Sequence, residues 1–588
     1  MKIWILGKPK KLFARFRLPT ELYRYITYVF FSTLLGLLAG LGAVLFHYLL
    51  DLSRNFFEEG NFADMLNVDA RLIVLVPVIG AMTTASMTRF FPETAKQKGV
   101  TSVIKSVLIH NGFIPLRVTI FHLIAPLVSI GTGAPLGPEG PAAKIGSGLG
   151  SWMCQVLRLS QSEMKMYAAA GAGAAISAVF NAPIAGVFFS IEIILLNDIK
   201  NRILGGFIIA AVVANLISRA ILGDTSVFNI PPYHFPALED YPIFLLLGIV
   251  CGAVSLLYFL ISNFSAHLVR TRLKIKNGFI LILPLSLIFG FVLLRYPELF
   301  GVGYGAMNGV INGNYDITLV ATLLALKIVF VALFLRSGAY GGLFAPALYI
   351  GVFTGFLFSW VIDALFGIAT DPVLFSLVAM GGVLAGIHSI PLTSMMLVFE
   401  LTNDYRLILP LMLVSVIAYL VVIYVNNGSL YTRELREDGI NVAIYGESTL
   451  LSKIRVRDIM RVDFESVYTT TPLRKILPLL GDSGCNDIFV VDKQNALSGV
   501  ISIRDIRHVL LSSDMTDVLL AMDISAPAPI LTDADTVAEA LGRIEEYDIE
   551  NIPVVDSHES KVVMGMITRH DILKAYNRLL ERGDRINL

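Results

Sequence analysis

One carboxylate in this sequence lies where no solvated charged face can account for it. The stretch GTGAPLGPEGPAAKIG, residues 131–146, places Glu139 among glycines, prolines and alanines inside a long apolar region. No other acidic residue lies between Glu93 and Glu163. Ionisable side chains in such surroundings are costly and indicate a functional site by default. The structural alternative is an ion pair with the nearby Lys144.

The motif around Glu139 recurs in altered form in the second half of the apolar region. GPEGP (137–141) has the form of GLFAP (342–346), and NAPIAGVFFSIE (181–192) has the form of SIPLTSMMLVFE (389–400). In the second pair the proline precedes the final glutamate by the same number of positions. Related halves with Gly- or Pro-interrupted helices in corresponding places are typical of transporters that bind substrate where the halves meet.

The interrupted helices indicate the charge of that substrate. Gly and Pro break a helix at membrane depth only where the freed backbone groups face protein or a cavity. Pro141 and Pro346 fit the first turn of a helix, so a helix is expected to begin at each break. Their unpaired N–H groups would point into the membrane interior and attract an anion without holding it by a full charge.

Most of the chain must lie in a membrane to position these segments. The 588 residues are 55% hydrophobic and only 16% charged, which indicates a polytopic all-α membrane protein. Apolar stretches long enough to cross a bilayer are expected at 28–50, 71–90, 117–136, 203–221, 242–264, 278–294, 317–335, 347–366 and 407–426.

Charge and cysteine content exclude other classes. Residues 1–27 carry only basic charges before Glu21, so this segment is expected to stay cytoplasmic, and it has no cleavage site typical of a signal peptide. A net charge of zero argues against nucleic-acid binding. The three cysteines are too dispersed for a metal site or a disulfide framework. The sequence contains no H-E-x-x-H or G-x-S-x-G motif, so no enzyme is expected.

A soluble α/β module is predicted after a linker at 436–455, because charged residues become frequent beyond Tyr431. Two segments of this module, 488–510 and 552–576, match one another. Both contain the pattern G-x-x-[ST]-x-x-D, formed by Gly499, Ser502 and Asp505 in the first copy and by Gly565, Thr568 and Asp571 in the second.

The module resembles a tandem pair of CBS domains, at 456–522 and 523–588. The resemblance implies that Ser502 and Thr568, at helix N-termini, hold the phosphate of an adenine nucleotide, and that Asp505 and Asp571 bind its ribose. The alternative is that both aspartates only cap helices.

The membrane region, 28–435, resembles the CLC family of chloride channels and chloride/proton exchangers. GPEGP is similar to the family motif G-[RKP]-E-G-P, GGLFAP to G-x-F-x-P, and FELTNDYRLILP (399–410) to a further recurrent segment. The resemblance implies two inverted-topology halves and a homodimer with one pore per subunit, in the cell (inner) membrane with the CBS pair in the cytoplasm. It implies that Glu139 is the gate, occupying the anion path when deprotonated, and that the anion is bound by Lys98, Gly99, Gly137, Gly140, Leu343, Phe344 and Tyr431.

Three positions depart from the family pattern. QKGVTSV aligns Lys98 with the anion-coordinating serine, where a full positive charge would favour a tightly bound anion such as bicarbonate. The alternative is that Lys98 turns to the cytoplasmic surface beside Lys96. Ile193 stands where proton-exchanging members often have a second glutamate, and Pro138 replaces a frequent arginine.

Of the three, Ile193 favours a chloride channel or weakly coupled transporter, because the usual internal proton acceptor is missing. A proton-coupled antiporter and a transporter of another anion are the alternatives within the family. A CBS-regulated cation transporter is the alternative of a different class, although it would need clustered carboxylates within the membrane, and here the acids are isolated.

Overall fold

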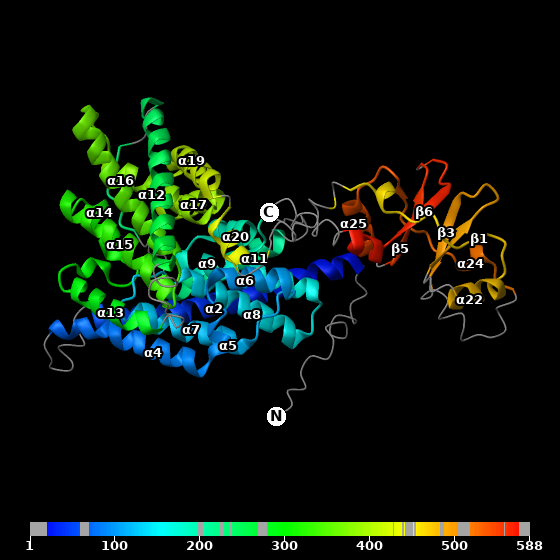
Figure 1. Cartoon of the computed structure of the whole chain (residues 1–588), viewed down its shortest axis with the longest axis horizontal. Helices are drawn as coiled ribbons and strands as arrows, with labels where there is room; N and C mark the ends of the chain where they lie inside the picture. Colours follow the sequence, from blue (N-terminus) through cyan, green and yellow to red (C-terminus); the bar gives the residue numbers. More distant parts are fainter. Residues whose placement is uncertain are drawn as a thin grey trace. The chain divides into compact units, whose positions relative to one another are not determined.

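The chain forms two compact units, Met1–Ile440 and Asn441–Leu588. The computed structural model describes residues 20–58, 70–197, 204–223, 228–234, 238–267, 279–426, 428–437, 440, 451, 454–482, 487–502, 518–547, 549–557 and 559–575. Most of the predicted linker, residue Asp505 and the basic segment up to Pro19 lie outside these residues. Figure 1 shows the helical first unit and the mixed α/β second unit.

The first unit is built from helices, several of them short and broken (Figure 1). They are α2 (Thr20–Glu58), α4 (Val76–Phe90), α5 (Pro92–Ala95), α6 (Gly99–Ile109), α7 (Leu116–Gly131), α8 (Glu139–Leu157), α9 (Gln161–Phe180), α10 (Pro183–Phe189), α11 (Leu204–Leu222), α12 (Tyr241–His267), α13 (Phe279–Leu293), α14 (Tyr304–Ile311), α15 (Ile317–Ser337), α16 (Phe344–Phe366), α17 (Pro372–His388), α18 (Pro391–Thr402), α19 (Ile408–Asn426) and α20 (Leu430–Glu437).

Each apolar stretch expected from the sequence forms a helix, although 132–136, the end of the stretch 117–136, lie beyond the helix α7. Within the described residues, seven helices are long and apolar enough to cross a membrane. The stretches at 117–136 and 278–294 form the shorter helices α7 and α13. A multi-pass membrane protein is therefore confirmed, although some of its helices are shorter than a full span.

Glycine allows the helices next to each break to pack closely in both halves. A Cβ atom at Gly146 of α8 would lie 2.0 Å from the Gly171 carbonyl oxygen of α9. A Cβ atom at Gly351 of α16 would likewise lie 2.5 Å from Cα of Met380 in α17. Backbones approach this closely only where no side chain intervenes. The pairs α8–α9 and α16–α17 thus hold the two interrupted segments in matching surroundings.

The second unit contains two three-stranded sheets with the same topology. Strands β1 (Ser466–Tyr468), β2 (Asp487–Val491) and β3 (Leu497–Ser502) form the first sheet, and β4 (Leu531–Thr532), β5 (Asn551–Val555) and β6 (Val563–Thr568) form the second. In each, the first pair is parallel and the second antiparallel, with a register shift at Val490/Val491 or at Val554/Val555. Helices α22 (Leu473–Asp482) and α25 (Val537–Tyr547) each pack on one hydrophobic core. The predicted sequence repeat is thus a structural repeat.

Candidate functional site

The two interrupted segments meet through their backbones. The Gly137 N–H donates to the Gly342 carbonyl at 2.8 Å, and the Gly342 N–H donates to the Gly137 carbonyl at 2.6 Å. Immediately beyond this bridge, α8 begins at Glu139 and α16 begins at Phe344. The two segments lie far apart in the sequence, yet their helix N-termini start from one paired loop. The positive ends of two helix dipoles therefore converge here.

Glu139 lies at this convergence. Its side chain is 1% exposed, and neither carboxylate oxygen has a hydrogen-bond partner among the residues that the structure describes. The backbone N–H groups of Glu139 itself and of Ala345 lie near the carboxylate, although neither meets hydrogen-bond geometry. A Cβ atom at Gly137 would lie 2.1 Å from Glu139 Oε2, and one at Gly342 would lie 3.2 Å from it. The carboxylate is therefore folded back over the bridged glycines, where only residues without a side chain leave room.

Aromatic side chains connect this site to Tyr431. The Phe344 ring lies 5.4 Å from the His388 ring, and His388 Nδ1 lies 2.8 Å from the Tyr431 hydroxyl oxygen. Leu343, Phe344 and Tyr431 are all buried. His388 was not expected as a site residue. Its sequence signal is that it is an ionisable residue at the end of an apolar segment, directly before SIPLTS.

Lys98 and Gly99 lie near the start of α8 but away from the Glu139 carboxylate. Lys98 Nζ donates to the Gly338 carbonyl at 2.6 Å and lies 4.2 Å from the centre of the Tyr340 ring. Lys98 is partly buried, and its ammonium group is held by this carbonyl, whereas Lys96 is exposed. Gly99, with φ of 63°, begins α6 beside a small cavity that Gly140 also lines.

The structural alternative for Glu139, an ion pair with Lys144, is not formed. Lys144 is 1% exposed, and its ammonium group donates to Ser102 Oγ at 2.7 Å rather than to the carboxylate. No ion pair joins Lys144 to Glu139 in the described structure. Glu139 is thus a buried carboxylate without a cationic partner, whereas Lys144 belongs to a separate polar contact with α6.

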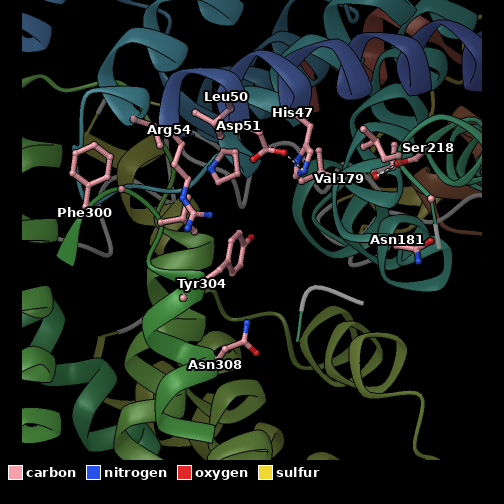
Figure 2. A pocket seen from close by; sticks show the side chains of 18 residues that line it. His47, Leu50, Asp51, Arg54, Val179, Asn181, Ser218, Phe300, Tyr304 and Asn308 are labelled. Atoms are coloured by element: carbon pink, nitrogen blue, oxygen red, sulfur yellow. Dashed lines mark hydrogen bonds and ion pairs between the residues drawn. The ribbon is translucent and has the colours of Figure 1, made fainter. Parts of the chain in front are cut away.

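A larger cavity, of about 400 Å³, has Pro138, the residue before Glu139, in its lining. Figure 2 shows other side chains that line it. Helix α2 contributes His47, Asp51 and Arg54 to its wall, with His47 Nε2 lying 3.1 Å from Asp51 Oδ2. Figure 2 shows Tyr304 of α14 on the opposite side. The cavity is polar at the wall formed by α2 and extends to Pro138, which precedes Glu139. It is therefore a suitable approach for a hydrated ion.

Two glutamates join the halves reciprocally. Glu192, in a π-helical turn after α10, accepts from the Leu392 and Thr393 N–H groups at 3.0 and 2.6 Å. Glu400 of α18 accepts from the Ile184 and Ala185 N–H groups at 2.9 and 2.8 Å. Each carboxylate thus caps the second and third residues of the helix that begins the other half's segment. The glutamate of each matched segment therefore accepts hydrogen bonds from the residues that follow the proline of the other segment.

Replacing either glutamate with Ala is expected to destabilise the first unit by about 1.5–3 kcal/mol per charge-assisted hydrogen bond lost, because two helix N–H groups lose their carboxylate acceptor. The measurement is the unfolding transition of the purified protein in detergent. Glu239→Ala, at an exposed position, is the matched control and should have little effect. An unchanged transition for Glu192→Ala and Glu400→Ala would show that the reciprocal caps contribute nothing.

In the second unit, Thr568 and Asp571 form a capping box at the helical residues 569–575. Thr568 Oγ1 donates to Asp571 Oδ2 at 2.7 Å, and the Asp571 N–H donates to Thr568 Oγ1 at 3.1 Å. Arg461 contacts the other Asp571 oxygen at 2.7 Å. Burial opposes ionisation of Asp571, but these hydrogen bonds outweigh it and hold the pKa of the carboxyl below its usual range. Ser502 ends β3 at the equivalent place in the first repeat.

Comparisons with known proteins match both units. A model of the family described as voltage gated chloride channel matches residues 79–422, and the CBS domain matches 456–512 and 521–578. The H(+)/Cl(-) exchange transporter ClcA of Vibrio vulnificus is 30% identical over 402 residues, covering 66% of this chain and 85% of that protein. The chloride channel protein CLC-f of Arabidopsis thaliana is 28% identical over 76% of this chain, and the match spans 63% of that protein.

Solved structures have the same fold. A slow cyanobacterial Cl-/H+ antiporter superimposes with a TM-score of 0.60 at 23% identity, over 70% of this chain and 97% of that chain. A eukaryotic CLC transporter superimposes with a TM-score of 0.60 at 19% identity, over 94% of this chain and 98% of that chain.

Proposed function

Because the chain belongs to the voltage-gated chloride channel (CLC) family, we propose that it carries chloride-type anions across a membrane along a path controlled by Glu139. The proposal includes a homodimer with one path in each subunit, in the cell (inner) membrane, with the CBS pair in the cytoplasm. It includes no enzymatic activity and no required cofactor.

The observation that carries the proposal is the position of one carboxylate. Glu139 is buried, has no hydrogen-bond partner and lies where two helices begin. Those helix N-termini attract an anion, and they attract the carboxylate for the same reason. The side chain is thus a tethered competitor for the anion, and its protonation or displacement empties the site. Chloride efflux from liposomes containing the wild-type chain or Glu139→Gln tests this proposal.

Proton coupling is the second candidate within the family, and the exchange transporters among the relatives support it. Against tight coupling, Ile193 is fully buried where an acidic relay would be needed, and the neighbouring Glu192 is occupied as a helix cap. We favour a channel or a weakly coupled transporter. Reversal potentials measured under opposed chloride and pH gradients distinguish a channel from a coupled transporter. A reversal potential that shifts with the pH gradient indicates coupling, and one that does not shift indicates a channel.

The CBS pair is proposed to bind an adenine nucleotide and to alter transport. Thr568 lies at a helix N-terminus, which suits a phosphate, and Asp571 would have to exchange its contact with Arg461 for ribose hydroxyls. Calorimetry of residues 441–588 with ATP, ADP and AMP is expected to give heat of binding that Asp571→Asn removes. Asp463→Asn, at an exposed aspartate, is the control. If millimolar nucleotide gives no heat of binding, the role of Asp571 is limited to helix capping.

A further inference from the structure

The larger cavity lies beside the segment that leads to Glu139. Helix α2 packs against this segment at Ser53, because a Cβ atom at Gly131 would lie 2.1 Å from Ser53 Oγ. The segment before α14 packs against it as well, since the Gly301 N–H donates to the Gly133 carbonyl at 3.0 Å. Residues of α2 and of the segment before α14 line the cavity. Two walls of the cavity are therefore fixed to the residues that precede the gate candidate.

Arg54 brings a permanent positive charge to this cavity. Figure 2 shows its side chain extending from α2 toward Tyr304. Tyr304 in turn lies within electrostatic range of both Arg54 and Glu139. Among the described residues that line the cavity, Arg54 is the only lysine or arginine. The one strong cation of the cavity is thus separated from the gate candidate by a single aromatic side chain and open space.

The Glu139 carboxylate lacks a partner where it now lies. It is buried, and neither oxygen is hydrogen-bonded within the described part of the chain. Such a group is costly to bury, so a position beside a cation stabilises it. The small cavity lined by Lys98 and Lys144 holds only about 20 Å³, enough for one water-sized particle but not for a carboxylate. The larger cavity, which extends to Pro138, has the necessary room.

We propose that Arg54 binds the Glu139 carboxylate when this side chain leaves the bridged glycines. The inference rests on the proposed function, in which displacement of Glu139 opens the anion path. A guanidinium group has five N–H donors in a planar fork, so it can hold a carboxylate in addition to its existing contacts. The resulting ion pair stabilises the open arrangement. Arg54 therefore sets how often the path is open, although it does not lie beside the two helix starts that attract the anion.

Removing the arginine in two backgrounds separates this role from a general attraction of anions. At neutral pH, Arg54→Gln is expected to lower chloride efflux from liposomes about tenfold when Glu139 is present, since one charge-assisted contact is lost. It should leave the efflux of Glu139→Gln unchanged, because the amide has no charge to pair, and this result also shows that the arginine variant folds. Arg54→Lys keeps the charge and should retain most of the efflux.

Arg71→Gln, at an exposed arginine that does not line the cavity, is the matched control and should leave efflux unchanged. An equal loss of efflux from Arg54→Gln in both backgrounds would show that Arg54 acts on the anion itself, and would overturn the proposal. No loss in the presence of Glu139 would overturn it as well.

A crystal structure of Gly137→Ala gives a second reading. The added Cβ atom would lie 2.1 Å from Glu139 Oε2, so the carboxylate must leave its present position. We expect it within hydrogen-bonding distance of the Arg54 guanidinium group. A displaced carboxylate that contacts another group would overturn the role of Arg54 while leaving Glu139 as the gate. A Glu139→Gln variant that keeps the wild-type pH profile of efflux would instead end both proposals.

Discussion

Glu139→Gln is expected to keep anion flux high at every pH from about 4.5 to 7.5, whereas flux through the wild type should rise as the pH falls. The amide cannot ionise, so it does not compete with the anion for the helix N-termini that meet beside Gly137 and Gly342. Control by one titrating carboxylate can change flux up to about tenfold per pH unit. Efflux from chloride-loaded liposomes gives the measurement, and any proton movement seen with the wild type should be lost.

The control for this prediction is Glu239→Gln, which changes an exposed glutamate and should keep the wild-type profile. If Glu139→Gln also keeps the wild-type pH profile, the gate lies elsewhere in the chain. A variant without flux that is still folded would assign Glu139 to conduction rather than to gating.

Gly137→Ala is expected to open the path although the Glu139 carboxylate itself is not replaced. The new Cβ atom would lie 2.1 Å from Glu139 Oε2 and 2.9 Å from Glu139 Cδ, closer than non-bonded atoms can stand. The Glu139 side chain is the flexible partner, so it must leave its position over the bridged glycines. Flux at pH 7.5 should then rise toward that of Glu139→Gln, with a weaker dependence on pH, in the same liposome assay.

Gly140→Ala is the matched control, because it adds the same atom to the same motif where there is room. The nearest heavy atom to a Cβ there would be Cα of Gly342, at 3.5 Å, which is an ordinary contact. Combining Gly137→Ala with Glu139→Gln should add little to either change, since both empty one site. If Gly137→Ala stays closed with normal pH dependence, or if Gly140→Ala opens as well, displacement of Glu139 is not the cause.

The helix starts could be predicted from the sequence because local chemistry determines them. Proline in a first turn and glycine at a break mark where α8 and α16 begin, whatever they pack against. Hydrophobic length likewise predicts the membrane helices, since the bilayer imposes it. Glu139 could be identified because a lone carboxylate in apolar sequence needs a specific explanation.

The partners across the molecule could not be predicted in this way. The Gly137–Gly342 bridge, the reciprocal caps of Glu192 and Glu400 and the contact between His388 and Tyr431 join residues far apart in sequence, and local patterns carry no information on such pairs. The partners of the lysine side chains are the least predictable from sequence, because a long flexible side chain reaches several partners from one backbone position.

Chloride release by the wild-type protein tests the central claim most directly. Liposomes loaded with potassium chloride and placed in impermeant anion hold their chloride until valinomycin lets potassium leave, so release reports electrogenic anion movement through the protein. A chloride electrode is expected to record rapid efflux after valinomycin, faster at acid pH and dependent on the reconstituted protein. Retention of chloride at every pH, with dissipation of an imposed cation gradient by the same vesicles, would contradict the proposal that this chain conducts anions past Glu139.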